Sequence, residues 1–149
     1  MPQIKPEYEE VTEFPMMASK LVKKYPEVFD DLDINSIRCV AITNKERSSK
    51  KRRWEVKAVS MPIKMDCAYS YYIIIYNSDW TEMEEKNQVM LVAAALLAIP
   101  TDSSEEGKTN PFDLKDFDLM IRTFGVGYLD NDKIPNLINE NVNWQLIDR

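Results

Sequence analysis

The chain of 149 residues contains no histidine. This absence excludes catalytic arrangements that need an imidazole, including Ser-His-Asp triads and Cys-His pairs. It also excludes the H-E-x-x-H zinc motif, in which two imidazoles one helical turn apart hold the metal and the glutamate acts on the bound water. Mechanisms built on a serine with a lysine, or on a pair of carboxylates, remain open.

Cysteines and long apolar runs are scarce as well. The two cysteines, Cys39 and Cys67, lie in strand-like segments and form no C-x-x-C pair, so we expect buried reduced thiols. The longest apolar run, Val89 to Ile99, has 11 residues, whereas roughly 20 are needed to span a bilayer. Residues 1–5 show no apolar signal region. We therefore expect a cytoplasmic protein without a membrane segment.

The hydrophobic content of 44% is enough to build one hydrophobic core in a chain of this length. We expect a single domain over residues 1–149, with its core between about 11 and 125. Residues 126–149 would then form a C-terminal extension.

Charge is unevenly distributed along the chain. Nineteen basic and 25 acidic residues give a net charge of −6, which argues against general nucleic-acid binding. A basic cluster nevertheless precedes a tryptophan, and it could follow a phosphate backbone while the ring stacks on a base. Its members are Lys45, Arg47, Lys50, Lys51, Arg52, Arg53 and Trp54. The alternative is a solvated hairpin tip with Trp54 turned into the core.

The first half of the chain predicts one helix and three strands. Pro15 can open a helix that ends near Tyr25, just before a second proline. Segments 37–43 and 54–61 predict two antiparallel strands joined by a long loop. Segment 69–76 is continuous, β-branched and aromatic, as expected for a strand that is buried on both faces. Any tyrosine that this strand turns outward could anchor a protein partner.

The second half predicts two further helices. Thr81 and Glu84 have the spacing of a capping box, so we expect a helix from 81 to 99 whose apolar second half is buried on all sides. Asn110 and the proline after it can start another helix, which Gly125 would stop. Beyond it we expect a short helix at 134–138 and a strand at 142–146. The fold class is α+β, with a mixed or antiparallel sheet of three or more strands packed on the buried central helix.

This order of elements resembles the phage metallopeptidase family, whose members are relatives of SprT-like zincins. The resemblance spans roughly Val11 to Gly125, and Trp80 stands where the family has a tryptophan before its metal-binding helix. The family's H-E-x-x-H falls on the run Ala94-Ala95-Leu96-Leu97-Ala98, and its third histidine falls on Phe112. The resemblance therefore implies a zincin-like fold in which alanines and a phenyl ring occupy all four functional positions, with no metal and no cofactor.

What the resemblance implies for function is a catalytically inactive, phage-encoded protein in the host cytoplasm. We expect it to bind and inhibit or modulate a host protein, for which a defence system such as CRISPR is a candidate. One alternative is a nucleic-acid-binding accessory protein that uses the basic loop 45–53. A further alternative is an enzyme with a relocated active site.

Overall fold

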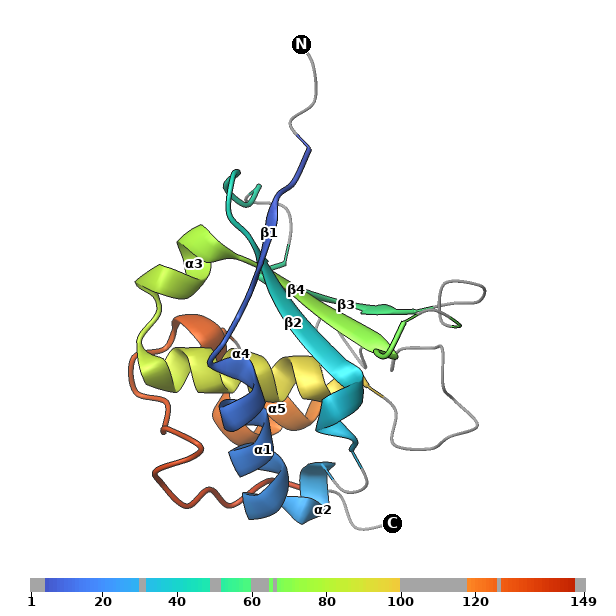
Figure 1. Ribbon diagram of the computed structural model, residues 1–149. Coiled ribbons are helices and arrows are strands. Elements are labelled where there is room, and N and C mark those ends of the chain that lie inside the picture. The colour runs from blue at the N-terminus through green and yellow to red at the C-terminus, as the bar shows by residue number, and fades with distance from the viewer. Residues whose placement is uncertain are drawn as a thin grey trace.

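A computed structural model describes residues 5–29, 32–48, 52–59, 65, 67–99, 118–125 and 127–146. It has two layers, a mixed β-sheet and a group of helices packed on one of its faces (Figure 1). The predicted α+β class is therefore confirmed. The strands are β1 (Tyr8–Glu10), β2 (Ile37–Ile42), β3 (Trp54–Ala58) and β4 (Tyr71–Tyr76). The α-helices are α1 (Phe14–Lys24), α2 (Pro26–Phe29), α3 (Asn77–Glu82), α4 (Glu85–Leu97) and α5 (Asp118–Phe124), and two 3₁₀ turns are η1 (Ile34–Ser36) and η4 (Tyr128–Asp130).

The order of strands in the sheet is β1-β2-β4-β3. Segments 37–43 and 54–61 form strands of opposite direction, as predicted, but they are not neighbours, because β4 lies between β2 and β3. Strand β4 runs parallel to β2, with Ile37 opposite Tyr71, and antiparallel to β3, with Trp54 opposite Ile75. The most apolar strand takes an interior position, and β3, which carries exposed Glu55 and Lys57, takes an edge where charged side chains reach water.

Strand β4 is buried more completely on one face than on the other. Tyr71, Ile73 and Ile75 face the helices and are buried, whereas Tyr72 and Ile74 on the opposite face are only half-buried. The prediction of burial on both faces is therefore wrong, because among the described residues the helices cover one side of the sheet (Figure 1). The uncovered side is called the open face below.

The predicted helix from 81 to 99 is two helices. Helix α3 ends at Glu82 and α4 begins at Glu85, because Met83 and Glu84 have extended backbone conformations. The capping box is also wrong: the Thr81 hydroxyl donates to the carbonyl of Asn77 within α3 (2.9 Å). The expected burial of the apolar half is confirmed, since every residue from Val89 to Leu96 is at most 1% exposed.

Helix α1 is confirmed within a residue of its predicted ends. Phe14, Met17, Ala18 and Leu21 recur at helical spacing and are all buried. The predicted helix stop at Gly125 is also confirmed, because this glycine follows α5 directly and has a φ of +92°. The predicted start at Asn110 lies outside the described residues.

The C-terminal segment belongs to the core. Tyr128, Ile134, Leu137 and Trp144 are buried members of the main hydrophobic cluster. The expected extension is therefore wrong, and so are the helix at 134–138 and the strand at 142–146, since these residues form turns and irregular backbone. Because the segment has little regular structure, buried apolar side chains spaced along its backbone hold it against the rest of the core.

Polar contacts to the helices also hold the C-terminal segment. The Tyr25 hydroxyl donates to the carbonyl of Leu137 (2.7 Å), and the Lys24 ammonium donates to the carbonyl of Ile138 (2.9 Å). These side chains satisfy backbone acceptors that no regular structure pairs. The segment is therefore tied to the end of α1.

Both cysteines are free thiols, as expected, but they differ in burial. Cys39 faces the core at 2% exposure, and burial raises the pKa of its thiol to about 12. Cys67 is half-buried, and its Sγ lies 3.7 Å from the Tyr72 hydroxyl. The thiolate is the reactive form, so the two residues should react differently.

In the folded protein at pH 8, a thiol reagent should label Cys67 and leave Cys39 unlabelled. The Cys39 pKa lies above its ordinary value of 9.0, so the stabilisation from this residue is present below pH 9 and is lost as pH rises toward 12. Mass spectrometry of the labelled chain, with the variants Cys39→Ala and Cys67→Ser and with urea-unfolded protein as controls, measures this. Two labels on the folded chain would contradict the burial of Cys39.

No helix in the described part of the chain is long and apolar enough to cross a membrane.

Candidate functional site

The positions that the resemblance assigns to the metal motif lie in the second half of α4 and immediately after it. Ala94 and Ala95 are fully buried, and Ala98, immediately after the helix, is 4% exposed. Helix α4 contacts α1, α2, β3 and η4, so core elements surround these alanines. Phe112, the fourth position, lies outside the described residues. The three described positions are part of the hydrophobic core.

These side chains do not fit a zinc ion. Zinc in proteins is held by thiolate sulfur, imidazole nitrogen or carboxylate oxygen, and an alanine methyl group has no lone pair to offer. The described residues also contain no group of three or more Cys, Asp or Glu side chains that could hold a metal. The residues at the motif positions therefore support no step that runs through a metal ion.

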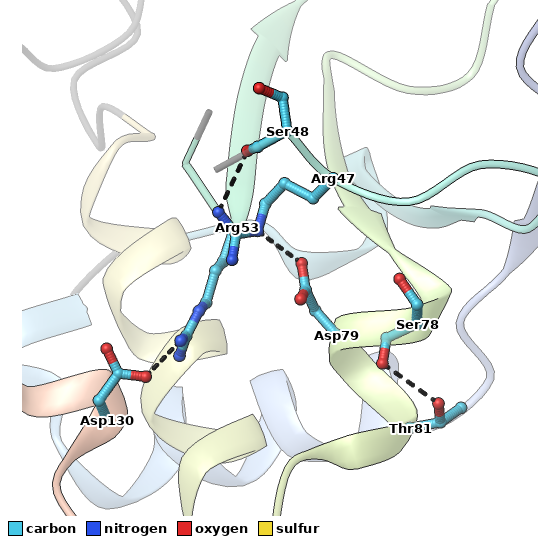
Figure 2. Close-up of polar contacts among 7 residues, drawn as sticks. All are labelled: Arg47, Ser48, Arg53, Ser78, Asp79, Thr81 and Asp130. Atoms are coloured by element: carbon cyan, nitrogen blue, oxygen red, sulfur yellow. Dashed lines mark hydrogen bonds and ion pairs between the residues drawn. The ribbon is translucent and has the colours of Figure 1, made fainter. Parts of the chain in front are cut away.

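The basic cluster is the second predicted site, and the structure divides it. Lys50 and Lys51 lie outside the described residues. Arg47 follows β2 and its Nε donates to Asp79 Oδ2 on α3 (2.7 Å), with both side chains only about a fifth exposed. Arg53 forms an ion pair with Asp130 of η4 (Figure 2). Two of the arginines thus connect the segment before β3 to α3 and η4.

The remaining members do not form a joint surface for a base and a phosphate. Trp54 is 4% exposed and belongs to the main hydrophobic cluster, so the alternative with its ring turned into the core is confirmed. Lys45 is half-buried and Arg52 is exposed. Because stacking requires an accessible ring, the geometry weighs against the predicted nucleic-acid site.

The carboxylates that pair with these arginines belong to an acidic hollow that sequence reasoning did not find. It has a volume of about 310 Å³ and lies between the α3–α4 junction and η4. Its acidic lining residues are Asp79, Glu82, Glu84, Asp130 and Asp132. The acidic composition of 79–85 was a signal in the sequence, but η4 is about 50 positions away, so only the fold brings the two groups together.

The ion pair between Arg47 and Asp79 should couple these residues by about 1 kcal/mol in a double-mutant cycle. Its short distance and low exposure distinguish it from the pair of Lys57 and Glu55, whose atoms lie 3.8 Å apart with both side chains 62% exposed. That exposed pair is the matched control and should show coupling near zero. Urea unfolding of the alanine variants measures both cycles, and equal coupling energies would contradict the prediction.

The open face of the sheet carries a third feature, a hollow of about 300 Å³. Tyr8, Glu10, Arg38, Val40, Tyr72 and Ile74 line it. Arg38 Nε lies 3.4 Å from the Glu10 carboxylate, and its guanidinium lies over the Tyr69 ring, 5.6 Å from the centroid. The hollow thus combines an apolar floor with a charged rim.

Hydrogen bonding alters two pKa values beside this hollow. A hydrogen bond with the Tyr72 hydroxyl raises the pKa of the Arg38 guanidinium. A hydrogen bond with Cys67, followed by burial, raises the pKa of Tyr72. Arg38 is charged and Tyr72 is neutral at physiological pH even at their ordinary pKa values, so both shifts act in the direction of the existing protonation states.

The outward tyrosines expected in segment 69–76 are not strongly exposed. Tyr71 and Tyr76 are buried, while Tyr69 and Tyr72 are half-buried. The most exposed tyrosine of this face is Tyr8 on β1, at 54%. Sequence reasoning missed Tyr8 because a strand of three residues shows no clear alternation.

A comparison with protein families matches residues 6–142, most of the chain, to the model described as "Putative phage metallopeptidase". Neither a search of curated proteins nor a search of solved structures found a match. The matched range includes β1, the whole sheet, α4 and most of the C-terminal segment, in agreement with a core that extends beyond residue 125. The chain therefore belongs to the phage metallopeptidase family.

Proposed function

We propose that this chain is a non-catalytic member of the phage metallopeptidase family and that it acts by binding another protein. The observation that carries the proposal is the burial of Ala94, Ala95 and Ala98 inside a core that the family model covers. Core residues must pack at the density of an organic crystal. A helix that presented ligands to a metal has instead become a packing element.

The composition of the whole chain supports this proposal. No histidine is present elsewhere, so an imidazole ligand cannot have moved to another position. The family's way of activating water needs two imidazoles and a general base, and the motif positions supply none of the three. We therefore propose that this fold acts through its surface.

The partner that we propose is a protein of the bacterial host, which the chain would inhibit or modulate. The family description names phage proteins, and a phage protein meets host proteins in the infected cell. Host defence nucleases, including those of CRISPR systems, are the first candidates to test.

Metal analysis and a peptidase assay test the loss of chemistry. The full-length chain, purified without a histidine tag and incubated with zinc, should retain far less than one zinc per chain after dialysis, and it should not cleave unfolded casein. A family member that contains H-E-x-x-H serves as the positive control. One zinc per chain, or cleavage that a chelator stops, would contradict the proposal.

Affinity capture tests the binding function. The chain should retain one host protein in 1:1 stoichiometry, and the purified pair should remain together in light scattering at physiological salt. The matched bait is the same chain unfolded and covalently trapped on the resin. Recovery of no stoichiometric partner at low salt and high protein concentration would count against the proposal.

The nucleic-acid alternative receives no support from the described geometry, because Arg47 and Arg53 pair with carboxylates and Trp54 is buried. No observation favours a relocated active site.

A further inference from the structure

Strand β1 is the feature that indicates how a partner could bind. In the sheet order β1 is terminal, and all three of its residues are exposed. Among the described residues, β2 is its only neighbour. An edge strand of this kind presents unpaired backbone groups that another chain can use.

The register shows which backbone groups point outward. The Val11 amide donates to the carbonyl of Cys39 (3.0 Å), and the Thr43 amide donates to the carbonyl of Glu7 (2.9 Å). In antiparallel pairing these groups alternate along the strand, and Glu9 lies opposite Ala41 between these two pairs. The backbone groups of Tyr8 and Glu10 therefore point away from β2.

The charge along the outer edge of β1 indicates which kind of strand can bind there. Glu7 and Glu9 have exposed side chains on one face of β1, and neither forms an ion pair within the described part of the chain. A second copy pairing edge to edge would bring acidic side chains against one another, which is destabilising. A partner strand with lysine or arginine at alternate positions would neutralise them.

The other face of β1 favours apolar side chains. Tyr8 and Glu10 both lie on this face, at the hollow on the open face, but the Glu10 carboxylate is paired with Arg38 (3.4 Å). Val40 and Ile74 form the apolar part of the lining. Side chains of an added strand would alternate between the two faces of the sheet. Every second residue would therefore lie beside Tyr8 and the hollow.

We infer that the outer edge of β1 binds an extended segment of the partner protein as a fifth strand. The segment alternates basic residues, which lie beside Glu7 and Glu9, with apolar residues, which lie beside Tyr8. Main-chain hydrogen bonds to Tyr8 and Glu10 supply affinity, and the alternation supplies specificity. This inference rests on the proposed protein-binding function and names the surface that carries it.

A synthetic peptide of sequence Lys-Val-Lys-Leu-Lys-Val tests the inference on the full-length chain. Binding should slow hydrogen exchange at the amides of Tyr8 and Glu10, measured by NMR, and leave exchange at Glu9 unchanged. Two control peptides have the same sequence and the same charges. In each of them every second backbone amide carries an N-methyl group, and the two peptides differ in which alternate set of amides is methylated. One of the two should lose at least tenfold in affinity, because methylation removes the donors that face β1.

The variant Glu7→Lys with Glu9→Lys should also weaken binding at least tenfold. Its matched control is Glu55→Lys with Glu82→Lys, which makes the same change in net charge at exposed positions outside β1 and should bind as the wild type does. Equal affinity for all three peptides, equal loss in both double variants, or exchange protection away from β1 would overturn the inference. The methylated peptides use the wild-type chain, so this arm does not depend on the folding of a variant.

Capture from host lysate separates this inference from the proposed function. A partner that the wild type retains and the Glu7→Lys, Glu9→Lys variant loses supports both. A partner that both chains retain equally overturns the β1 surface and leaves the function standing. Stoichiometric zinc with no partner would overturn the function, whatever the peptide binds.

Discussion

Replacing Ala95 with glutamate, the residue of the family motif, should destabilise the protein by about 4 kcal/mol or more. Ala95 is fully buried within α4, between other buried residues. A longer side chain overpacks the core, which costs about 1–3 kcal/mol. The glutamate carboxylate would also lose its hydration, and no partner in the core would replace it. Urea unfolding followed by circular dichroism measures the change.

The matched control for this prediction is Lys20→Glu on the exposed face of α1, which should change stability by about 0.5 kcal/mol or less. The triple variant Ala94→His, Ala95→Glu, Ala98→His should likewise gain no zinc, because its new ligands would enter packed core. If Ala95→Glu unfolds at the wild-type urea concentration, or if the triple variant binds one zinc, the space around Ala95 is open rather than packed.

Truncating Trp144 to alanine should cost about 3–5 kcal/mol of folding stability. The Trp144 ring is 6% exposed and packs edge-on against three aromatic rings, with centroids 5.2 Å from Phe124, 5.5 Å from Tyr25 and 6.1 Å from Phe29. The ring therefore holds the C-terminal segment against α2, α5 and the residue that follows α1. Urea unfolding, with the slope of the transition as a check on two-state behaviour, measures the loss.

Trp144→Phe is the control that separates packing from hydrogen bonding. Within the described part of the chain, the Trp144 Nε1 group is buried without a hydrogen-bond partner. Replacing indole by phenyl thus removes volume but no hydrogen bond, and it should cost about 1 kcal/mol. A loss below about 1 kcal/mol for Trp144→Ala would show that residues 126–149 are a dispensable extension, as the sequence suggested.

The sheet shows why the strand order could not be predicted from the sequence. Segments 37–43 and 54–61 follow each other along the chain and look like a hairpin, yet β4 inserts between them. Whether a segment forms a strand depends on its own composition. Which strand lies beside it in the sheet depends on which apolar faces the helices cover. The open face and the outer edge of β1, which carry the proposed interaction, depend on that same order.

The basic cluster shows the same limit for a site. Its residues lie within ten positions of the sequence and predict one charged surface. Arg47 and Arg53 instead turn toward Asp79 and Asp130, which come from separate elements. The tertiary structure pairs opposite charges across long sequence separations, and no local pattern contains that information. Trp54 could be predicted only as one of two alternatives for the same reason.

By itself the sequence determined that imidazole chemistry is absent, that the apolar second half of α4 is buried, and that the fold is α+β. These properties follow from composition and from the local hydrophobic pattern, and both are visible in the sequence alone. Only the tertiary structure decided the strand order, the inward turn of the arginines and the inclusion of Trp144 in the core. Each of these depends on contacts between distant segments, whose energies no single segment contains.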